Sequence, residues 1–153
     1  MKATGYLCIL AMMMMVSACS DNGCEPVHPD SEASQMLAFA SSNGIAAVKH
    51  SSGMYYQVVN QGSGPTPNLN SRVYVTYTGK KMDGTVFDQA TTPVNFVLGG
   101  LIEGWKVGLP LIQKGGHIRL IVPSSMAYGC TGSGNVITPN SVIYFDIQLI
   151  DVQ

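Results

Sequence analysis

The chain has 153 residues, of which 46% are hydrophobic and 11% are charged, and its formal net charge is −1. This length suits one globular domain with a targeting segment and a short linker. A near-neutral charge gives no electrostatic basis for binding nucleic acid, so that class of partner is excluded.

The first residues are typical of a secretory signal. Lys2 is followed by an apolar run over residues 6–16, which is shorter than the roughly 20 apolar residues that cross a bilayer. The run ends in Val16-Ser17-Ala18-Cys19, which resembles the lipobox of bacterial lipoproteins. We therefore expect residues 1–18 to be a lipoprotein signal peptide and Cys19 to be lipidated. The alternative is an ordinary signal peptide, with Cys19 incidental.

A lipidated Cys19 predicts a cell-envelope location. Each buried methylene group of an acyl chain contributes about 0.8 kcal/mol, so several chains give a stable membrane anchor. Ser20 stands where an Asp retains enterobacterial lipoproteins in the inner membrane. This favours the outer membrane, with the domain facing the periplasm or the cell surface.

Cys24 and Cys130 remain after removal of the signal peptide. In an oxidising compartment they could form one disulfide. They could equally be a free thiol on a linker and a small buried residue, because sequence does not give their separation in space.

The segment before the domain has two parts. Residues 20–31 are polar and contain two prolines, which is typical of a tether. A short helical pattern then runs from Glu32 to Ala40 and stops at Asn43-Gly44. We expect residues 19–52 to form a lipidated tether and a short helix that packs on the domain.

From Gly53 onward the pattern changes to strands and turns. Apolar residues alternate with polar ones, and an Asp83-Gly84 turn signal lies between two of the segments. His117, at the start of one strand, is predicted to be solvated. The predicted strands are Met54–Val59, Arg72–Thr78, Val86–Phe87, Val94–Leu98, His117–Val122 and Val142–Val152.

One helix interrupts the strands. Trp105, Leu109 and Ile112 have helical spacing within residues 102–113, and Gly108 and Pro110 should keep this helix short. The predicted fold class is α+β, with a twisted antiparallel sheet of about five strands wrapped around one short helix.

Several motifs occur in the order found in one family. They are Val75-Thr76-Tyr77-Thr78-Gly79, Asp83-Gly84-Thr85-Val86-Phe87-Asp88, Phe96-Val97-Leu98-Gly99, Leu101-Ile102-Glu103-Gly104-Trp105, Ala127-Tyr128-Gly129, Ile137-Thr138-Pro139-Asn140 and Phe145-Asp146-Ile147. Together they resemble an FKBP-type peptidyl-prolyl cis-trans isomerase domain over residues 53–153. Residues 43–56 resemble the lead-in of secreted members such as macrophage infectivity potentiators. The long dimerisation helix of that subgroup is absent, so we expect a monomer.

The resemblance implies an apolar site between sheet and helix. Its catalytic residues would be Tyr77, Asp88 and Tyr128. Its substrate-binding residues would be Phe87, Phe96, Leu101, Ile102, Trp105, Val136, Ile137 and Phe145. If Asp88 is buried it needs a hydrogen-bond donor, and Tyr77 is the predicted one. The backbone N–H of Ile102 and the hydroxyl of Tyr128 would donate to the ligand.

Such a site needs neither a metal nor a cofactor. The barrier to X–Pro rotation is about 18–20 kcal/mol because resonance flattens the amide, and an apolar pocket favours the twisted transition state. The sequence has no nucleophile elbow, Walker loop or zincin motif, and His28, His50 and His117 lack zinc spacing.

Some positions depart from the family pattern. Val94 replaces a frequent aromatic residue, and residues 89–92 lack an arginine that often pairs with the aspartate. The expected partners are proline-containing polypeptide clients, with macrolides such as rapamycin or tacrolimus as inhibitors. The leading hypothesis is a folding enzyme for envelope or secreted proteins. The alternative is a client-binding chaperone or a surface interaction lipoprotein with little isomerase activity.

Overall fold

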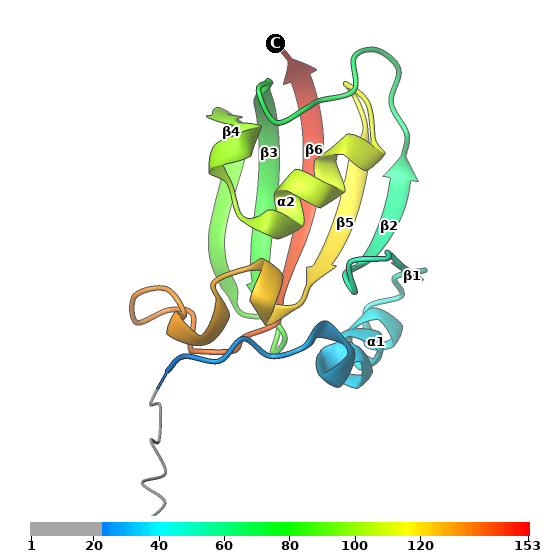
Figure 1. Ribbon diagram of the computed structural model, residues 1–153. Helices are drawn as coiled ribbons and strands as arrows, with labels where there is room; N and C mark the ends of the chain where they lie inside the picture. The colour runs from blue at the N-terminus through cyan, green and yellow to red at the C-terminus, as the bar shows by residue number, and fades with distance from the viewer. Residues whose placement is uncertain (1–22) are drawn as a thin grey trace, which may run out of the picture.

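The computed structural model describes residues 23–153. The expected signal peptide and the lipidation site at Cys19 lie outside the described residues. One six-stranded antiparallel sheet has the strand order β1-β2-β5-β6-β3-β4, and one helix crosses a face of it (Figure 1). The strands are β1 (Val48–Lys49), β2 (Tyr55–Asn60), β3 (Arg72–Lys81), β4 (Val86–Val97), β5 (His117–Val122) and β6 (Ile143–Val152); the α-helices are α1 (Ala33–Ser42) and α2 (Glu103–Gly108). The predicted antiparallel α+β architecture is confirmed.

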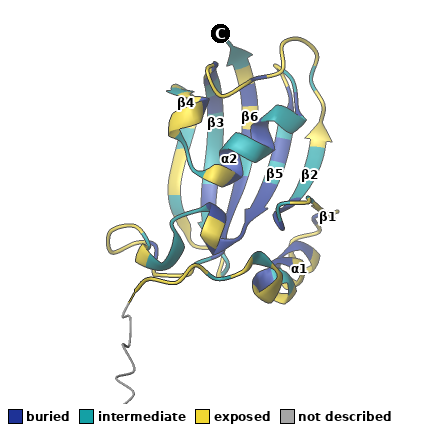
Figure 2. Cartoon of the chain, viewed as in Figure 1, coloured by how far each residue is buried: buried dark blue, intermediate teal, exposed yellow. Residues whose placement is uncertain are grey.

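The alternation of apolar residues places the central strands correctly. β5 has the predicted bounds, the predicted inward faces of β5 and β6 are buried, and so are Val73 and Val75 of β3 (Figure 2). The two-residue edge strand β1 was not predicted, because it is too short to show a period. It pairs with β2 and adds the sixth strand.

β4 corrects one prediction. The two short strands expected at residues 86–87 and 94–98 are parts of a single strand. Tyr77 of β3 pairs with Ala90, whereas Val75 pairs with Val94, so the ladder shifts register between them. The irregular stretch includes Pro93, which has no N–H to donate, as edge strands allow. This bulge breaks the apolar alternation, which is why the sequence pattern divided the strand.

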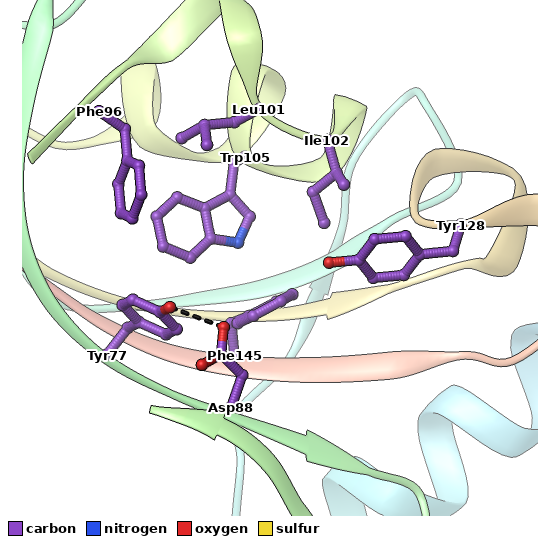
Figure 3. A pocket seen from close by; sticks show the side chains of 8 residues that line it. All are labelled: Tyr77, Asp88, Phe96, Leu101, Ile102, Trp105, Tyr128 and Phe145. Carbon is purple, nitrogen blue, oxygen red and sulfur yellow. Dashed lines mark hydrogen bonds between the residues drawn. The ribbon is translucent and has the colours of Figure 1, made fainter. Parts of the chain in front are cut away.

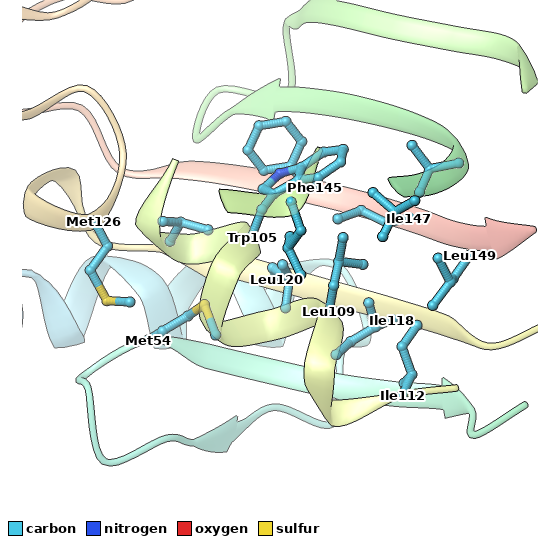
Figure 4. Packing of buried hydrophobic residues seen from close by; sticks show 14 of the residues in the cluster. Met54, Trp105, Leu109, Ile112, Ile118, Leu120, Met126, Phe145, Ile147 and Leu149 are labelled. Carbon is cyan, nitrogen blue, oxygen red and sulfur yellow. The ribbon is translucent and has the colours of Figure 1, made fainter. Parts of the chain in front are cut away.

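The main core lies between the sheet and α2. Trp105 and Leu109 pack over the inward residues of β5 and β6 (Figure 4). Gly104 and Gly108 allow this close approach, since a Cβ on Gly104 would lie 2.5 Å from Val122 and one on Gly108 2.6 Å from Leu120. Glycine thus brings the helix backbone onto β5, although it lowers helix propensity.

The helix is shorter than the predicted range. α2 ends at Gly108 and continues as a 3₁₀ turn over Leu109–Leu111, which contains Pro110. Ile112 lies beyond both and is fully buried. The helical spacing therefore predicted correctly that Ile112 is buried in the core, although Ile112 itself is not part of a helix.

α1 covers the opposite face of the sheet at one end. Met36 and Phe39 pack against Ile121 of β5 and Tyr144 of β6 in a second core cluster. The rings of Phe39 and Tyr144 lie 5.2 Å apart between centroids. The prediction that the N-terminal helix packs on the domain is confirmed. Among the helices of residues 23–153, none has the length and apolar character to cross a membrane.

The prediction that His117 is solvated is wrong. Its side chain is 22% exposed, and Nε2 forms a hydrogen bond with Asp146. Asp146 also accepts hydrogen bonds from Arg119 Nε and the Tyr144 hydroxyl, both at 3.1 Å. Residues of two neighbouring strands meet here, and local sequence does not show such a cross-strand cluster.

The open question about the cysteines is resolved by the structure. Cys24 and Cys130 form a disulfide, with their Cα atoms 5.3 Å apart. The bond joins the N-terminal segment to the long connection between β5 and β6.

Candidate functional site

A pocket opens between α2 and the sheet. Its eight lining residues come from four regions of the chain: β3 and β4, the start of α2, the β5–β6 connection, and β6 (Figure 3). The cavity volume is about 150 Å³, enough for a small ring and too small for a folded segment. Its lining residues are Tyr77, Asp88, Phe96, Leu101, Ile102, Trp105, Tyr128 and Phe145, here called the aromatic pocket.

Trp105 is the centre of the aromatic pocket. Its ring lies 5.2 Å from Tyr77, 5.3 Å from Phe145 and 6.4 Å from Phe96, each nearly perpendicular. These are edge-to-face contacts, which fix ring orientation beyond what burial alone does. Trp105 is 4% exposed and Phe145 is 3% exposed, so the base of the pocket is buried and largely apolar.

The rim of the pocket is formed where the chain enters α2. Leu101 and Ile102 immediately precede the helix and are half-buried. The Ile102 carbonyl accepts the backbone hydrogen bonds of Trp105 and Lys106, whereas its own N–H bonds to no atom of residues 23–153. This N–H is therefore a donor available to a ligand.

Asp88 and Tyr77 form the polar pair of the pocket. The Tyr77 hydroxyl donates a 2.7 Å hydrogen bond to Asp88 Oδ2, as predicted, although Asp88 is exposed rather than buried. Burial, the hydrogen bond to Asp88 and its negative charge raise the pKa of Tyr77 above its ordinary value. Asp88 makes no ion pair with any of residues 23–153, in keeping with the absence of a nearby arginine.

Tyr128 reaches the pocket from the opposite side. Its hydroxyl points into the pocket, toward the space between Trp105 and Phe145 (Figure 3). Burial, followed by the charge of Asp88, raises the pKa of Tyr128. The raised pKa keeps the hydroxyl protonated at neutral pH, and because it has no hydrogen-bond partner among the described residues it is free to donate.

Three predicted site residues do not line the aromatic pocket. Phe87 packs behind it against Phe145, with ring centroids 5.6 Å apart. Phe87 instead lines a neighbouring second pocket with Val136 and Ile137, and Asp88 and Tyr128 lie between the two pockets. Ile137 is also 4% exposed and belongs to the main core.

Ser133 and Gly134 line the second pocket but were not predicted as site residues. Both belong to the glycine-rich segment over residues 129–134. The available signal was its position between Tyr128 and Val136, two predicted site residues.

A metal centre is not formed by the described chain. Within residues 23–153, no three His, Cys, Asp or Glu side chains lie close enough together to hold an ion. The aromatic pocket itself offers apolar surface, one carboxylate and hydrogen-bond donors.

Val94 stands at the position where the family pattern often has an aromatic residue. It is half-buried and packs against the main core. The aromatic contacts to Trp105 are made by Tyr77, Phe96 and Phe145 without it.

Comparison with known proteins gives one consistent family. Residues 64–150 match the family model described as FKBP-type peptidyl-prolyl cis-trans isomerase. The FKBP-type peptidyl-prolyl cis-trans isomerase FkpA of Escherichia coli (strain K12) is 42% identical over 118 residues, which cover 75% of this chain and 43% of FkpA.

Crystal structures give the same result. That of E. coli FkpA has a TM-score of 0.72 at 38% identity, covering 82% of this chain and 61% of FkpA. That of a peptidyl-prolyl cis-trans isomerase from Pseudomonas syringae pv. tomato has a TM-score of 0.72 at 35% identity, covering 82% of this chain and 93% of the other.

The chain spans less than half the length of FkpA, but the family match includes every residue of the aromatic pocket. The agreement of sequence, fold and pocket leads to one assignment: this chain belongs to the family of FKBP-type peptidyl-prolyl cis-trans isomerases.

Proposed function

We propose that this chain catalyses cis-trans isomerisation of X–Pro bonds in polypeptide clients (EC 5.2.1.8). The observation that carries the proposal is the aromatic pocket around Trp105, which combines a ring-sized apolar cavity with the Ile102 N–H and the Tyr128 hydroxyl as free hydrogen-bond donors. The relatives named as peptidyl-prolyl cis-trans isomerases favour this activity over a chaperone or surface-interaction role.

The physical basis is the resonance of the amide bond. Rotation about the C–N bond crosses a barrier of about 18–20 kcal/mol, because the bond loses its double-bond character in the twisted transition state. The twisted amide has a less polar C–O bond than the planar one. An apolar pocket therefore stabilises the transition state relative to the planar ground state, which is better hydrated.

The residues around Trp105 suit a proline ring. Trp105 would lie beneath the ring, with Phe96 and Phe145 beside it and Leu101 at the rim. The Ile102 N–H and the Tyr128 hydroxyl would hold carbonyl groups of the peptide while one side of the bond rotates. No covalent bond forms or breaks, so these groups act by binding and orientation alone.

Tyr77 and Asp88 would act as a fixed pair. The hydrogen bond directs the Tyr77 hydroxyl toward Asp88, which leaves the Tyr77 ring facing the proline. The Asp88 carboxylate would then lie beside the rotating amide as the negative group of the pocket.

The second pocket would receive the client residues next to proline. Phe87, Val136 and Ile137 give it an apolar lining, and Val136 is 52% exposed. Contacts there would set preference among clients rather than the rate of rotation.

We further propose that the domain works as a monomer on the outer membrane. In this division residues 1–18 are the signal peptide, residues 19–52 the lipidated tether with its helix, and residues 53–153 the isomerase domain. The Cys24–Cys130 disulfide supports an oxidising compartment. The clients would be proline-containing secreted or outer-membrane proteins.

The activity is tested with a short Xaa-Pro-Phe peptide and the full-length chain in mild detergent. We expect isomerisation that rapamycin or tacrolimus inhibits. Trp105 is the only tryptophan, so its fluorescence reports binding in the same sample. A folded chain that does not accelerate isomerisation would refute the proposal.

The anchor is tested separately. Mass spectrometry of the mature N-terminus should find acyl groups on Cys19, and Cys19→Ala should release the protein from the membrane fraction. An unmodified mature N-terminus at another residue would contradict lipidation.

A further inference from the structure

The segment preceding the family match holds the loop that carries Tyr128. Glu32 is 8% exposed, and its carboxylate accepts a 2.9 Å hydrogen bond from the backbone N–H of Ser124. The two residues are 92 positions apart in sequence. Ser124 begins a 3₁₀ turn over Ser124–Met126, and Tyr128 follows two residues later.

The same segment holds the other end of the loop covalently. The disulfide joins Cys24 to Cys130, two residues after Tyr128. The stretch from Ser124 to Cys130 is therefore attached to the N-terminal segment at both ends, and Tyr128 lies between the two attachments. Neither Cys24 nor Glu32 lies within residues 64–150, which match the family model.

The attachment at Glu32 has a firm base. Glu32 directly precedes α1, and α1 is seated on the sheet by Met36 and Phe39. A buried carboxylate requires a donor, and a hydrogen bond from N–H to a charged oxygen is stronger than one between neutral groups. Because Glu32 directly precedes α1, its hydrogen bond to Ser124 fixes the start of the Tyr128 loop relative to α1.

Within the loop, Met126 is buried in the main core, and Ala127 and Tyr128 pack against that core. Backbone hydrogen bonds run from Met126 to Pro123, from Ala127 to Ser124 and from Gly132 to Tyr128. These bonds shape the turns internally, and none of the three reaches a strand of the sheet. The Tyr128 hydroxyl has no partner of its own among residues 23–153 and depends on the loop for its position.

We propose that Glu32 is a positioning residue for isomerisation, which acts through Tyr128, with the Cys24–Cys130 disulfide as the second attachment. The inference rests on the proposed function, because Tyr128 matters only if its hydroxyl holds the bound peptide. It adds a residue from outside the matched domain to the machinery of the site.

The test compares Glu32→Ala with Glu32→Gln in the full-length chain. Glu32→Ala removes the acceptor and should lower kcat/KM about tenfold, mainly through KM, because misplacing a group that holds the substrate weakens binding. Glu32→Gln keeps an oxygen acceptor and should restore most of the activity. Phe39→Leu is the matched control, since it weakens the packing of α1 but leaves the Glu32–Ser124 bond.

A double-mutant cycle separates positioning from general destabilisation. If Glu32 acts through Tyr128, Glu32→Ala should have almost no further effect on kcat/KM in a Tyr128→Phe background. Additive losses would overturn the inference, and so would equal losses in Glu32→Ala and Phe39→Leu.

Hydrogen exchange provides a readout that does not depend on activity. The amides of Met126, Ala127 and Gly132 should exchange faster in Glu32→Ala, and in the wild type after reduction of the disulfide. Unchanged exchange of these amides in Glu32→Ala would overturn the inference that Glu32 holds the Tyr128 loop in place. A wild type that lacks turnover would refute the proposed function and with it the positioning role of Glu32, whereas an active wild type with an unaffected Glu32→Ala would refute only this inference. If Glu32→Ala does not fold, Cys24→Ser serves as the second variant, because it removes the other attachment of the Tyr128 loop.

Discussion

Tyr77 on β3 and Asp88 on β4 are joined across the strand pair by a 2.7 Å hydrogen bond from hydroxyl to carboxylate. The bond lies just beyond the bulge that shifts the register of the two strands. The irregular pairing of β3 and β4 therefore places Asp88, the only carboxylate that lines the aromatic pocket, at the edge of the cavity around Trp105.

The first prediction concerns this carboxylate. Asp88→Ala should lower kcat/KM about tenfold, because the pocket loses a fixed charge and Tyr77 loses its acceptor. Asp83→Asn is the control, since Asp83 lies in the same hairpin outside the pocket and Asn can still accept from Thr85. Peptide isomerisation assays measure both. Equal activity of wild type and Asp88→Ala would contradict a role for the carboxylate.

The second prediction concerns alkaline pH. Burial and the negative charge of Asp88 raise the pKa of both Tyr77 and Tyr128 above the ordinary value of about 10. A raised pKa keeps each hydroxyl protonated to higher pH, so both remain donors. We expect kcat/KM to stay constant from about pH 7 to about pH 9.5. A decline near pH 9 that is absent in Tyr128→Phe would show that Tyr128 ionises earlier.

The third prediction concerns acid stability. Burial alone would raise the pKa of Asp146, but the hydrogen bonds from His117, Arg119 and Tyr144 outweigh it and lower the pKa. As the pH falls, the unfolded chain therefore binds this proton first. The stabilisation is complete above about pH 4 and is lost as the pH falls through the folded-state pKa.

Asp146→Asn should accordingly reduce the free energy of unfolding at pH 7 by about 1–3 kcal/mol. It should also weaken the loss of stability between about pH 4 and pH 2. Urea unfolding at several pH values measures this, with Glu103→Gln as a control at an exposed helical position. An unchanged acid slope in Asp146→Asn would mean that this network does not govern acid stability.

The fourth prediction concerns the contact between α2 and β5. Gly108→Ala raises helix propensity by about 1 kcal/mol, but its Cβ would meet Leu120 at 2.6 Å. Overpacking costs about 1–3 kcal/mol, so we expect a small net destabilisation and a slower isomerase. Gly100→Ala is the matched control, because nothing lies within 4 Å of its added Cβ. Thermal unfolding distinguishes them, and a more stable Gly108→Ala would show that the helix can move away from β5.

Sequence reasoning located most of the aromatic pocket because the relevant signals are local or ordered along the chain. The alternation in β5 determines its bounds and its buried face. The motif series from Val75 to Phe145 identified the family, and with it the pairing of Tyr77 and Asp88. These features depend on neighbouring residues or on motif order, both of which a single sequence contains.

The tertiary structure decided what depends on distant partners. The bulge in β4 arises from pairing with β3, and Phe87 packs against Phe145 rather than lining the aromatic pocket. The bonds of Cys24 to Cys130 and of Glu32 to Ser124 join residues about a hundred positions apart. The sequence by itself determined most of the elements, the family and the residue types of the pocket. Only the folded chain decided which of those residues meet, because contacts between distant residues depend on the packing of the whole sheet and not on local periodicity.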